Sequence, residues 1–170
     1  MKYENKLNEY PIFSNLIDTE IKKFKEKIEL INFKSDDLII KEGQEGKSIL
    51  FLFEGDINIS QALTLITNKS DSEDNREKEL IRLSSMNQHI SLGEISLFNV
   101  DKKRSATVKA ISNCEVGRLT FDDLFEICDK NHDIGYKVMK NIGDIITKHL
   151  IKSNHKVLKL TTAISLLIDN

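Results

Sequence analysis

The 170-residue chain has little of several residue types whose abundance would mark a specialised class of protein. It contains a single proline and no tryptophan, so it is neither a proline-rich linker nor a collagen-like chain. Its two cysteines, Cys114 and Cys128, are too few for a disulfide framework, and we interpret both as reduced thiols. An excess of one charge is also missing, since 25 basic residues face 27 acidic ones. The net charge of −2 disfavours capture of nucleic acid by a strongly basic surface.

Long apolar runs are absent as well. No stretch approaches the roughly 18 apolar residues that mark a membrane-spanning helix, and the first residues lack the apolar segment of a signal peptide. We therefore expect a cytoplasmic protein without a membrane partner. What remains, 39% hydrophobic and 31% charged residues, is typical of a globular domain that buries a core.

The hydrophobic pattern predicts a helix, then strands, then helices. Apolar residues recur at spacings of three and four from Ile21 to Ile31, after a plausible N-cap at 18–20. The polar segment 67–78 is predicted to be a solvated loop between two strands. The expected strands are short and lie at 37–40, 48–53, 57–59, 80–83, 105–111 and 114–119. This order of elements predicts an α+β fold built around a small antiparallel β-roll or barrel.

The C-terminal segment has a different period. Apolar side chains follow a heptad rhythm, interrupted once at Ser153, at Ile146, Leu150, Val157, Leu160, Ile164 and Leu167. A small β-domain alone offers no place to bury so long a stripe. We therefore expect residues 133–168 to pair with the same helix of a second copy, as a homodimer. The alternative is that the segment folds back onto its own domain as two helices. The chain is accordingly divided into 1–132, a β-domain with an N-terminal helical segment, and 133–170, a long helix.

The segment 92–110 carries the residues with the clearest chemical meaning. Gly93 precedes a half-turn of helix-forming residues, whose free N–H groups can bind an anion. Arg104 lies ten residues after Glu94 and begins a predicted strand, which can return it to the same place. An arginine there suits a phosphate, and a glutamate suits the hydroxyl groups of a sugar. Together they describe a nucleotide site. The alternative is an exposed ion pair between Glu94 and Arg104 that binds no ligand.

These residues resemble the phosphate-binding cassette of the cyclic-nucleotide-binding domain family. That family includes bacterial catabolite activator proteins and the regulatory subunits of cAMP-dependent kinase. The resemblance extends from Pro11 to Ile151 and includes the glycines at 43, 46 and 55. It implies an antiparallel β-roll, the double-stranded β-helix or jelly roll, flanked by an N-terminal helix and a long C-terminal helix. It also implies a cyclic nucleotide as ligand, with cAMP favoured over cGMP.

The resemblance assigns a role to each cassette residue that follows Gly93. Glu94 would accept a hydrogen bond from the ribose 2′-hydroxyl. Arg104 would pair with the cyclic phosphate, assisted by Ser105 and by the backbone N–H groups of Ile95 and Ser96.

Further positions are implied outside the cassette. Ile81 and Leu83 would line the wall of the pocket. Counting from Arg104 places His149 and Leu150 where catabolite activator proteins use two hydroxyl residues to contact the base. Since neither residue here carries a hydroxyl group, the identity of the base is left open between adenine and guanine.

The leading prediction is a stand-alone sensor that signals through its C-terminal helix to an unidentified effector protein. His89 and Ser91 replace a glycine and an aromatic residue that the family usually has, which favours a ligand-free interaction module as one alternative. A second alternative is a cyclic dinucleotide binder, whose second phosphate would need Arg82 and Arg118.

Other functional classes are disfavoured. The chain leaves no room for a helix-turn-helix domain after the long helix, so we do not expect direct DNA binding. The four histidines show no metal-ligand spacing, and no nucleophile has an obvious base. We therefore expect neither a metal site nor an enzymatic activity.

Overall fold

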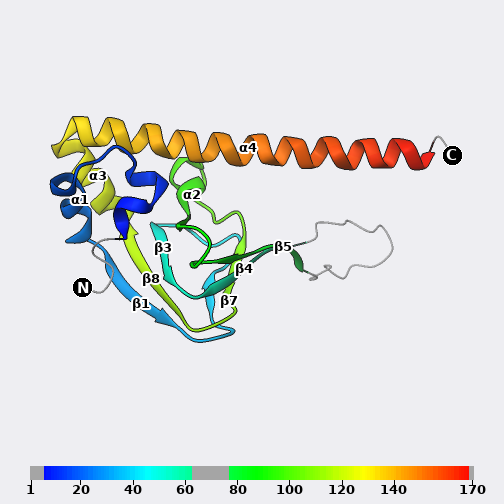
Figure 1. Ribbon diagram of the computed structural model, residues 1–170, viewed down its shortest axis with the longest axis horizontal. Helices are drawn as coiled ribbons and strands as arrows, with labels where there is room; N and C mark the ends of the chain where they lie inside the picture. Colours follow the sequence, from blue (N-terminus) through cyan, green and yellow to red (C-terminus); the bar gives the residue numbers. More distant parts are fainter. Residues whose placement is uncertain (1–5, 63–76, 169–170) are drawn as a thin grey trace.

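Two four-stranded antiparallel sheets form a β-roll, and a long helix lies along it (Figure 1). The computed structural model describes residues 6–62 and 77–168. One sheet has the strand order β1-β8-β3-β6 and the other the order β2-β7-β4-β5. The strands are β1 Glu29–Phe33, β2 Leu38–Ile40, β3 Ser48–Glu54, β4 Asp56–Ala62, β5 Glu77–Ser84, β6 Ile90–Leu92, β7 Thr107–Ala110 and β8 Cys114–Thr120. The helices are η1 Leu7–Glu9, η2 Pro11–Phe13, α1 Asp18–Lys25, α2 Glu94–Phe98, α3 Phe121–Lys130 and α4 His132–Ile168. The predicted α+β class and β-roll are confirmed.

β3 connects the β-roll to the helices, because its side chains belong to two different apolar clusters. All of its residues except the last are buried, as the nearly continuous apolar run predicts. Because side chains alternate along a strand, the two sets face opposite ways. Leu50 and Leu52 belong to the cluster between the two sheets, whereas Ile49, Phe51 and Phe53 belong to the cluster beneath the helices.

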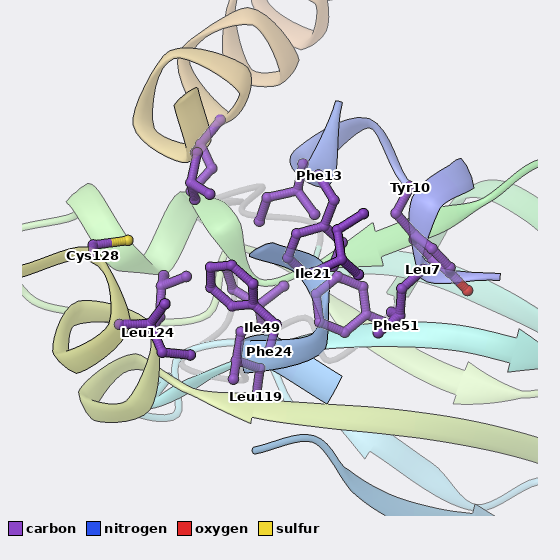
Figure 2. Close-up of a cluster of buried hydrophobic side chains, with 14 of the residues drawn as sticks. Leu7, Tyr10, Phe13, Ile21, Phe24, Ile49, Phe51, Leu119, Leu124 and Cys128 are labelled. Carbon is purple, nitrogen blue, oxygen red and sulfur yellow. The ribbon is translucent and has the colours of Figure 1, made fainter. Parts of the chain in front are cut away.

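The cluster beneath the helices joins the N-terminal segment to the rest of the domain. Figure 2 shows Phe13, Ile21 and Phe24 from the N-terminal helices against Phe51 of β3 and Leu124 of α3. Phe13 and Phe51 stack, with their ring centroids 5.4 Å apart. Burial of several aromatic rings makes this cluster the main apolar contribution to the stability of the helical layer.

α4 is one continuous helix, and hydrogen bonds anchor its first part to the N-terminal segment. Asn141 is buried, and its Nδ2 donates hydrogen bonds to the carbonyl oxygens of Ile12, at 3.0 Å, and Ser14, at 2.7 Å. Lys137 donates to the carboxylate of Glu20 at 3.0 Å. Every residue from 147 to 168 is exposed. The alternative in which the segment folds back as two helices is therefore wrong.

Several sequence-based boundaries are corrected by the strand pairing. The predicted first helix ends at Lys25, because residues 29–33 form β1 on the edge of a sheet, where they pair with β8. Pairing with a neighbouring strand thus overrides the helical spacing of Ile28 and Ile31. β6, which pairs with β3, was not predicted. The predicted loop 67–78 lies outside the described residues up to 76, while 77 and 78 belong to β5.

Candidate functional site

The candidate site is built where β6 ends and α2 begins. Gly93 has a φ of 97°, which lies in the left-handed region that favours glycine. The chain turns there into α2, a single short turn of helix that starts at Glu94. In Figure 1, α2 lies beneath the first half of α4. The predicted half-turn of helix after Gly93 is therefore present, and α4 packs against it.

Glu94 is buried although it is acidic. Its exposed fraction is 3%, and its Oε2 has no hydrogen-bond partner in the described part of the chain. The other oxygen, Oε1, lies 3.7 Å from Nδ1 of His149 on α4. Burial raises the pKa of this carboxyl group, although the charge of Arg104 acts in the opposite direction. The interpretation of Glu94 and Arg104 as an exposed ion pair does not hold, because Glu94 is inside the domain.

Arg104 reaches the same place from the other side. Its Nη2 donates to the carbonyl oxygen of Ser48 at 2.9 Å and to Ser48 Oγ at 3.3 Å. Its Nη1 is buried and has no partner among the described residues. Burial lowers the pKa of the guanidinium, and the charge of Glu94 opposes this shift. β3 thus holds one arm of the guanidinium and leaves the other arm available.

Two glycines allow the guanidinium to approach the backbone. A Cβ at Gly93 would lie 2.0 Å from Arg104 Nη1 and 2.8 Å from the carbonyl oxygen of Ser48. A Cβ at Gly46 would lie 2.8 Å from both Arg104 Nε and Ser96 Cβ. The sequence placed Gly46 in a turn and in the family pattern, but it did not predict a place for Gly46 in the site. Only the packing of Arg104 and Ser96 against that turn reveals it.

Backbone hydrogen bonds fix the loop that carries Arg104. The N–H of Arg104 donates to the carbonyl oxygen of Gln44 at 2.8 Å, and the N–H of Gly43 donates to the carbonyl oxygen of Arg104 at 2.9 Å. The N–H of Gly46 donates to Lys102 at 2.6 Å. The turn that precedes β3 and the loop that precedes β7 are therefore joined, which explains how residues about 60 positions apart build one site.

The remaining cassette residues differ in burial: Ser96 is buried, whereas Ile95 and Ser105 are exposed. Ser96 is 1% exposed. Its Oγ donates to the carbonyl oxygen of Lys103 at 3.2 Å, and its N–H donates to the carbonyl oxygen of Gly93 at 3.2 Å. The expectation of a free N–H at Ser96 is therefore wrong in this structure, because α2 closes a tight turn there. Ile95 and Ser105 are both exposed, and the carbonyl oxygen of Ser105 accepts a hydrogen bond from Gln61 at 2.6 Å.

The four residues predicted outside the cassette differ in burial and in their contacts with the cassette. Leu83 is half-buried and packs against the cluster between the sheets, whereas Ile81, on the same strand, is 46% exposed. His149 meets Glu94, as described above, whereas Leu150 is 59% exposed. Of the two predicted contacts from α4, the structure therefore brings only His149 into contact with the cassette.

Glu94 and Arg104 present buried hydrogen-bonding atoms that no described residue satisfies and that a ligand could pair with. Three buried side-chain atoms of the described residues lack a hydrogen-bond partner, and two of them are Glu94 Oε2 and Arg104 Nη1. Leaving such groups unpaired costs about 1–3 kcal/mol each, and more for a charged group. A molecule that offers a hydroxyl donor to the carboxylate and an anionic acceptor to the guanidinium would satisfy both.

The described residues were also compared with two other features, a metal site and a membrane-spanning helix. Within 6–62 and 77–168, no three histidine, cysteine, aspartate or glutamate side chains gather as they would around a metal ion. In the same ranges, no helix is both long enough and apolar enough to cross a bilayer.

Comparison with known proteins agrees with this chemistry. The chain is 28% identical over 102 residues to the cAMP-activated global transcriptional regulator CRP of Salmonella typhimurium, a match that covers 60% of this chain and 43% of that protein. The chain thus spans less than half the length of this relative. The fold is that of a cyclic nucleotide-binding domain from Methylobacillus flagellatus, with a TM-score of 0.75, 18% identity and coverage of 92% of this chain and 83% of the other. The regulatory domain of Toxoplasma gondii PKA, solved with cAMP, gives a TM-score of 0.61 at 20% identity, covering 74% and 43%.

The sequence profile of the family described as "Cyclic nucleotide-binding domain" matches residues 30–131, which include both sheets and the whole cassette. The chain therefore belongs to the cyclic nucleotide-binding domain family.

Proposed function

We propose that this chain is a regulatory protein that binds a cyclic mononucleotide between Glu94 and Arg104, with cAMP favoured over cGMP. The observation that carries the proposal is a pair of buried atoms, Glu94 Oε2 and Arg104 Nη1, that have no hydrogen-bond partner within 6–62 and 77–168. A cyclic nucleotide offers a ribose 2′-hydroxyl to the first and a phosphate oxygen to the second. The preference for adenine rests on the relatives, one named as cAMP-activated and one solved with cAMP.

In this binding mode the phosphate would replace the missing partner of Arg104. The backbone N–H of Ile95 would add a donor at the start of α2, and Ser105 would add one from the loop before β7. The apolar side chains of Ile81 and Leu83 would cover the sugar and base from β5. Both are partly exposed in this structure, so a ligand has apolar surface there to bury.

The direct test is calorimetric titration of the purified protein with cAMP, cGMP and cyclic di-GMP. We expect saturable binding of cAMP with a Kd of about 10 μM or lower, equivalent to roughly 7 kcal/mol of binding free energy, and weaker binding of cGMP. Absence of binding with all three ligands would contradict the proposal and favour an interaction module without a ligand. Tightest binding of cyclic di-GMP would favour the dinucleotide alternative. That outcome is not expected, because Arg82 and Arg118 already pair with Glu79 and Glu29.

The exposed half of α4 is the proposed output surface. Leu150, Val157, Leu160, Ile164 and Leu167 are each 54–79% exposed and recur in a heptad rhythm along one continuous helix. We propose that a second copy of this chain covers them in a parallel helix pair, and that an effector protein responds to the arrangement of that pair. Binding becomes a signal only if the ligand prefers one arrangement of the helices over another. Because the proposed ligand is an intracellular messenger, the proposal places the protein in the cytoplasm.

A charge in the middle of the stripe tests the helix pair. Leu160→Glu together with Ile164→Glu is expected to weaken self-association by at least about tenfold, because each buried apolar side chain contributes about 1.5–3 kcal/mol. Analytical ultracentrifugation over a concentration series measures the effect. Thr162→Glu adds one glutamate on the opposite side of the helix and should leave the dimer intact. A wild-type protein that sediments as a monomer at all concentrations would exclude the pairing.

A further inference from the structure

His149 is the point at which α4 meets the proposed ribose-binding carboxylate. Its Nδ1 lies 3.7 Å from Glu94 Oε1, while Glu94 Oε2 is buried without a partner among the described residues. The two oxygens of one carboxylate therefore have different surroundings. One faces a side chain of the long helix, and the other is available to a ligand. The side chain of His149 itself is 52% exposed, so it can also exchange protons with the solvent.

We propose that His149 is a positioning residue for the nucleotide. It holds Glu94 Oε1, so that Oε2 is presented to the ribose hydroxyl, and it fastens α4 to the cassette at that point. The inference rests on the proposed function, since it takes Glu94 as the acceptor for ribose. It adds a role for His149 that differs from contact with the base, and a direct connection between the ligand site and the proposed output helix.

The charges around His149 determine how this contact depends on pH. Glu94 faces it from α2, Arg104 lies behind Glu94, and Lys152 lies almost one turn further along α4. Burial lowers the pKa of His149, and the charge of Lys152 lowers it further. A bound cyclic phosphate adds a negative charge close to these groups, which raises the pKa of His149. Binding should therefore take up protons, and the contribution of His149 to affinity should increase as the pH falls.

Two substitutions separate the polar side chain of His149 from its charge. His149→Leu removes both and is expected to weaken cAMP binding by up to about fivefold, the scale of one ion-pair contact at the edge of a site. His149→Gln keeps a donor that does not titrate, and it should restore most of the affinity. His155 lies six residues further along the same helix and is exposed, so His155→Leu is the matched control and should bind like the wild type. Wild-type affinity in His149→Leu would overturn the proposal.

The proton balance of binding gives a readout that a purely structural role would not change. Calorimetry in two buffers of different ionisation enthalpy measures the protons taken up with each cAMP. Between about pH 8 and about pH 6, where histidine titrates, the wild type should take up more protons than His149→Gln. Glu94 is present in both proteins, so the difference reports the protons of His149 together with its coupling to Glu94. Equal proton uptake by the two proteins would contradict the proposal.

A measurement without ligand distinguishes this inference from the proposed function. In the ligand-free protein, Glu94→Gln should lower the pKa of His149, observed by NMR titration of the imidazole, because the carboxylate favours the charged ring. An unchanged titration of His149 would overturn the contact. A wild type that binds no cyclic nucleotide would instead refute the proposed function, whatever the titration of His149 shows. Normal binding by the wild type with unaffected His149 variants refutes only the inference.

Discussion

Replacing Arg104 by alanine is expected to weaken cAMP binding by about 1.5–3 kcal/mol, or roughly 10- to 150-fold, because a charge-assisted contact to phosphate is lost. The same change should alter the free energy of unfolding of the ligand-free protein by less than about 1 kcal/mol. The variant loses the hydrogen bonds to Ser48, but it also removes Nη1, which is buried and has no partner in the part of the chain that the structure describes. A large loss of affinity with little loss of stability is the signature of a group kept for a ligand.

Calorimetry and thermal unfolding with and without cAMP test this prediction together. At a cAMP concentration of about 100 times the Kd, the wild type should gain about 2.7 kcal/mol of stability, and Arg104→Ala should gain much less. Arg118→Ala is the matched control, because the exposed side chain of Arg118 on β8 pairs with Glu29 of β1 and does not contact the cassette residues described above. It should retain the affinity of the wild type. Equal affinities of Arg104→Ala and the wild type would remove Arg104 from the site.

Replacing Gly93 by alanine is expected to have the largest effect on folding, lowering the free energy of unfolding by about 2–4 kcal/mol. The left-handed φ of 97° disfavours alanine by about 1–2 kcal/mol. The added Cβ would also lie 2.0 Å from Arg104 Nη1 and 2.8 Å from a backbone oxygen, and such overpacking costs about 1–3 kcal/mol. Since Arg104 must move, cAMP binding should be lost as well. Denaturant unfolding and calorimetry on the same sample measure both effects.

A double-mutant cycle identifies the source of the Gly93 effect. If the clash with the guanidinium is a main part of it, Gly93→Ala combined with Arg104→Ala should be less destabilised than the sum of the two single variants. The control is Gly143→Ala in α4, where a Cβ would meet nothing within 4 Å. That change should raise the free energy of unfolding by about 0.5–1 kcal/mol, since alanine favours the helix. Strict additivity in the cycle would show that Arg104 does not approach Gly93 as described.

The energetic cost of burying Glu94 and Arg104 supports the interpretation of the site as a place for a ligand. A domain that buries a carboxylate and a guanidinium without satisfying all their hydrogen bonds is less stable than one with an apolar pair there. Such groups are typical of positions where a ligand supplies the missing partners. We therefore expect cAMP to stabilise this chain against unfolding, and thermal shift measurements provide a quick first indication.

The sequence by itself determined the class of fold and indicated the candidate site. Glycine at a turn, a glutamate and an arginine ten residues later can be recognised without coordinates, since these residue types suit the phosphate and the sugar of the proposed ligand. The continuous apolar run of β3 indicated burial on both faces, and the two clusters that it joins confirm this interpretation. The heptad rhythm of α4 indicated a helix whose apolar stripe its own domain does not cover, and residues 147–168 are exposed.

Only the tertiary structure decided which groups meet. Residues 28–31 have helical spacing, yet 29–33 pair with β8, because long-range strand pairing outweighs local periodicity. The contact between His149 and Glu94 depends on where a long helix crosses a short one, a relation that no local pattern records. The place of Gly46 against Arg104 and Ser96 likewise depends on two loops joined through backbone hydrogen bonds. Sequence patterns specify local chemistry and periodicity, whereas distances between remote residues are set by how the whole chain packs.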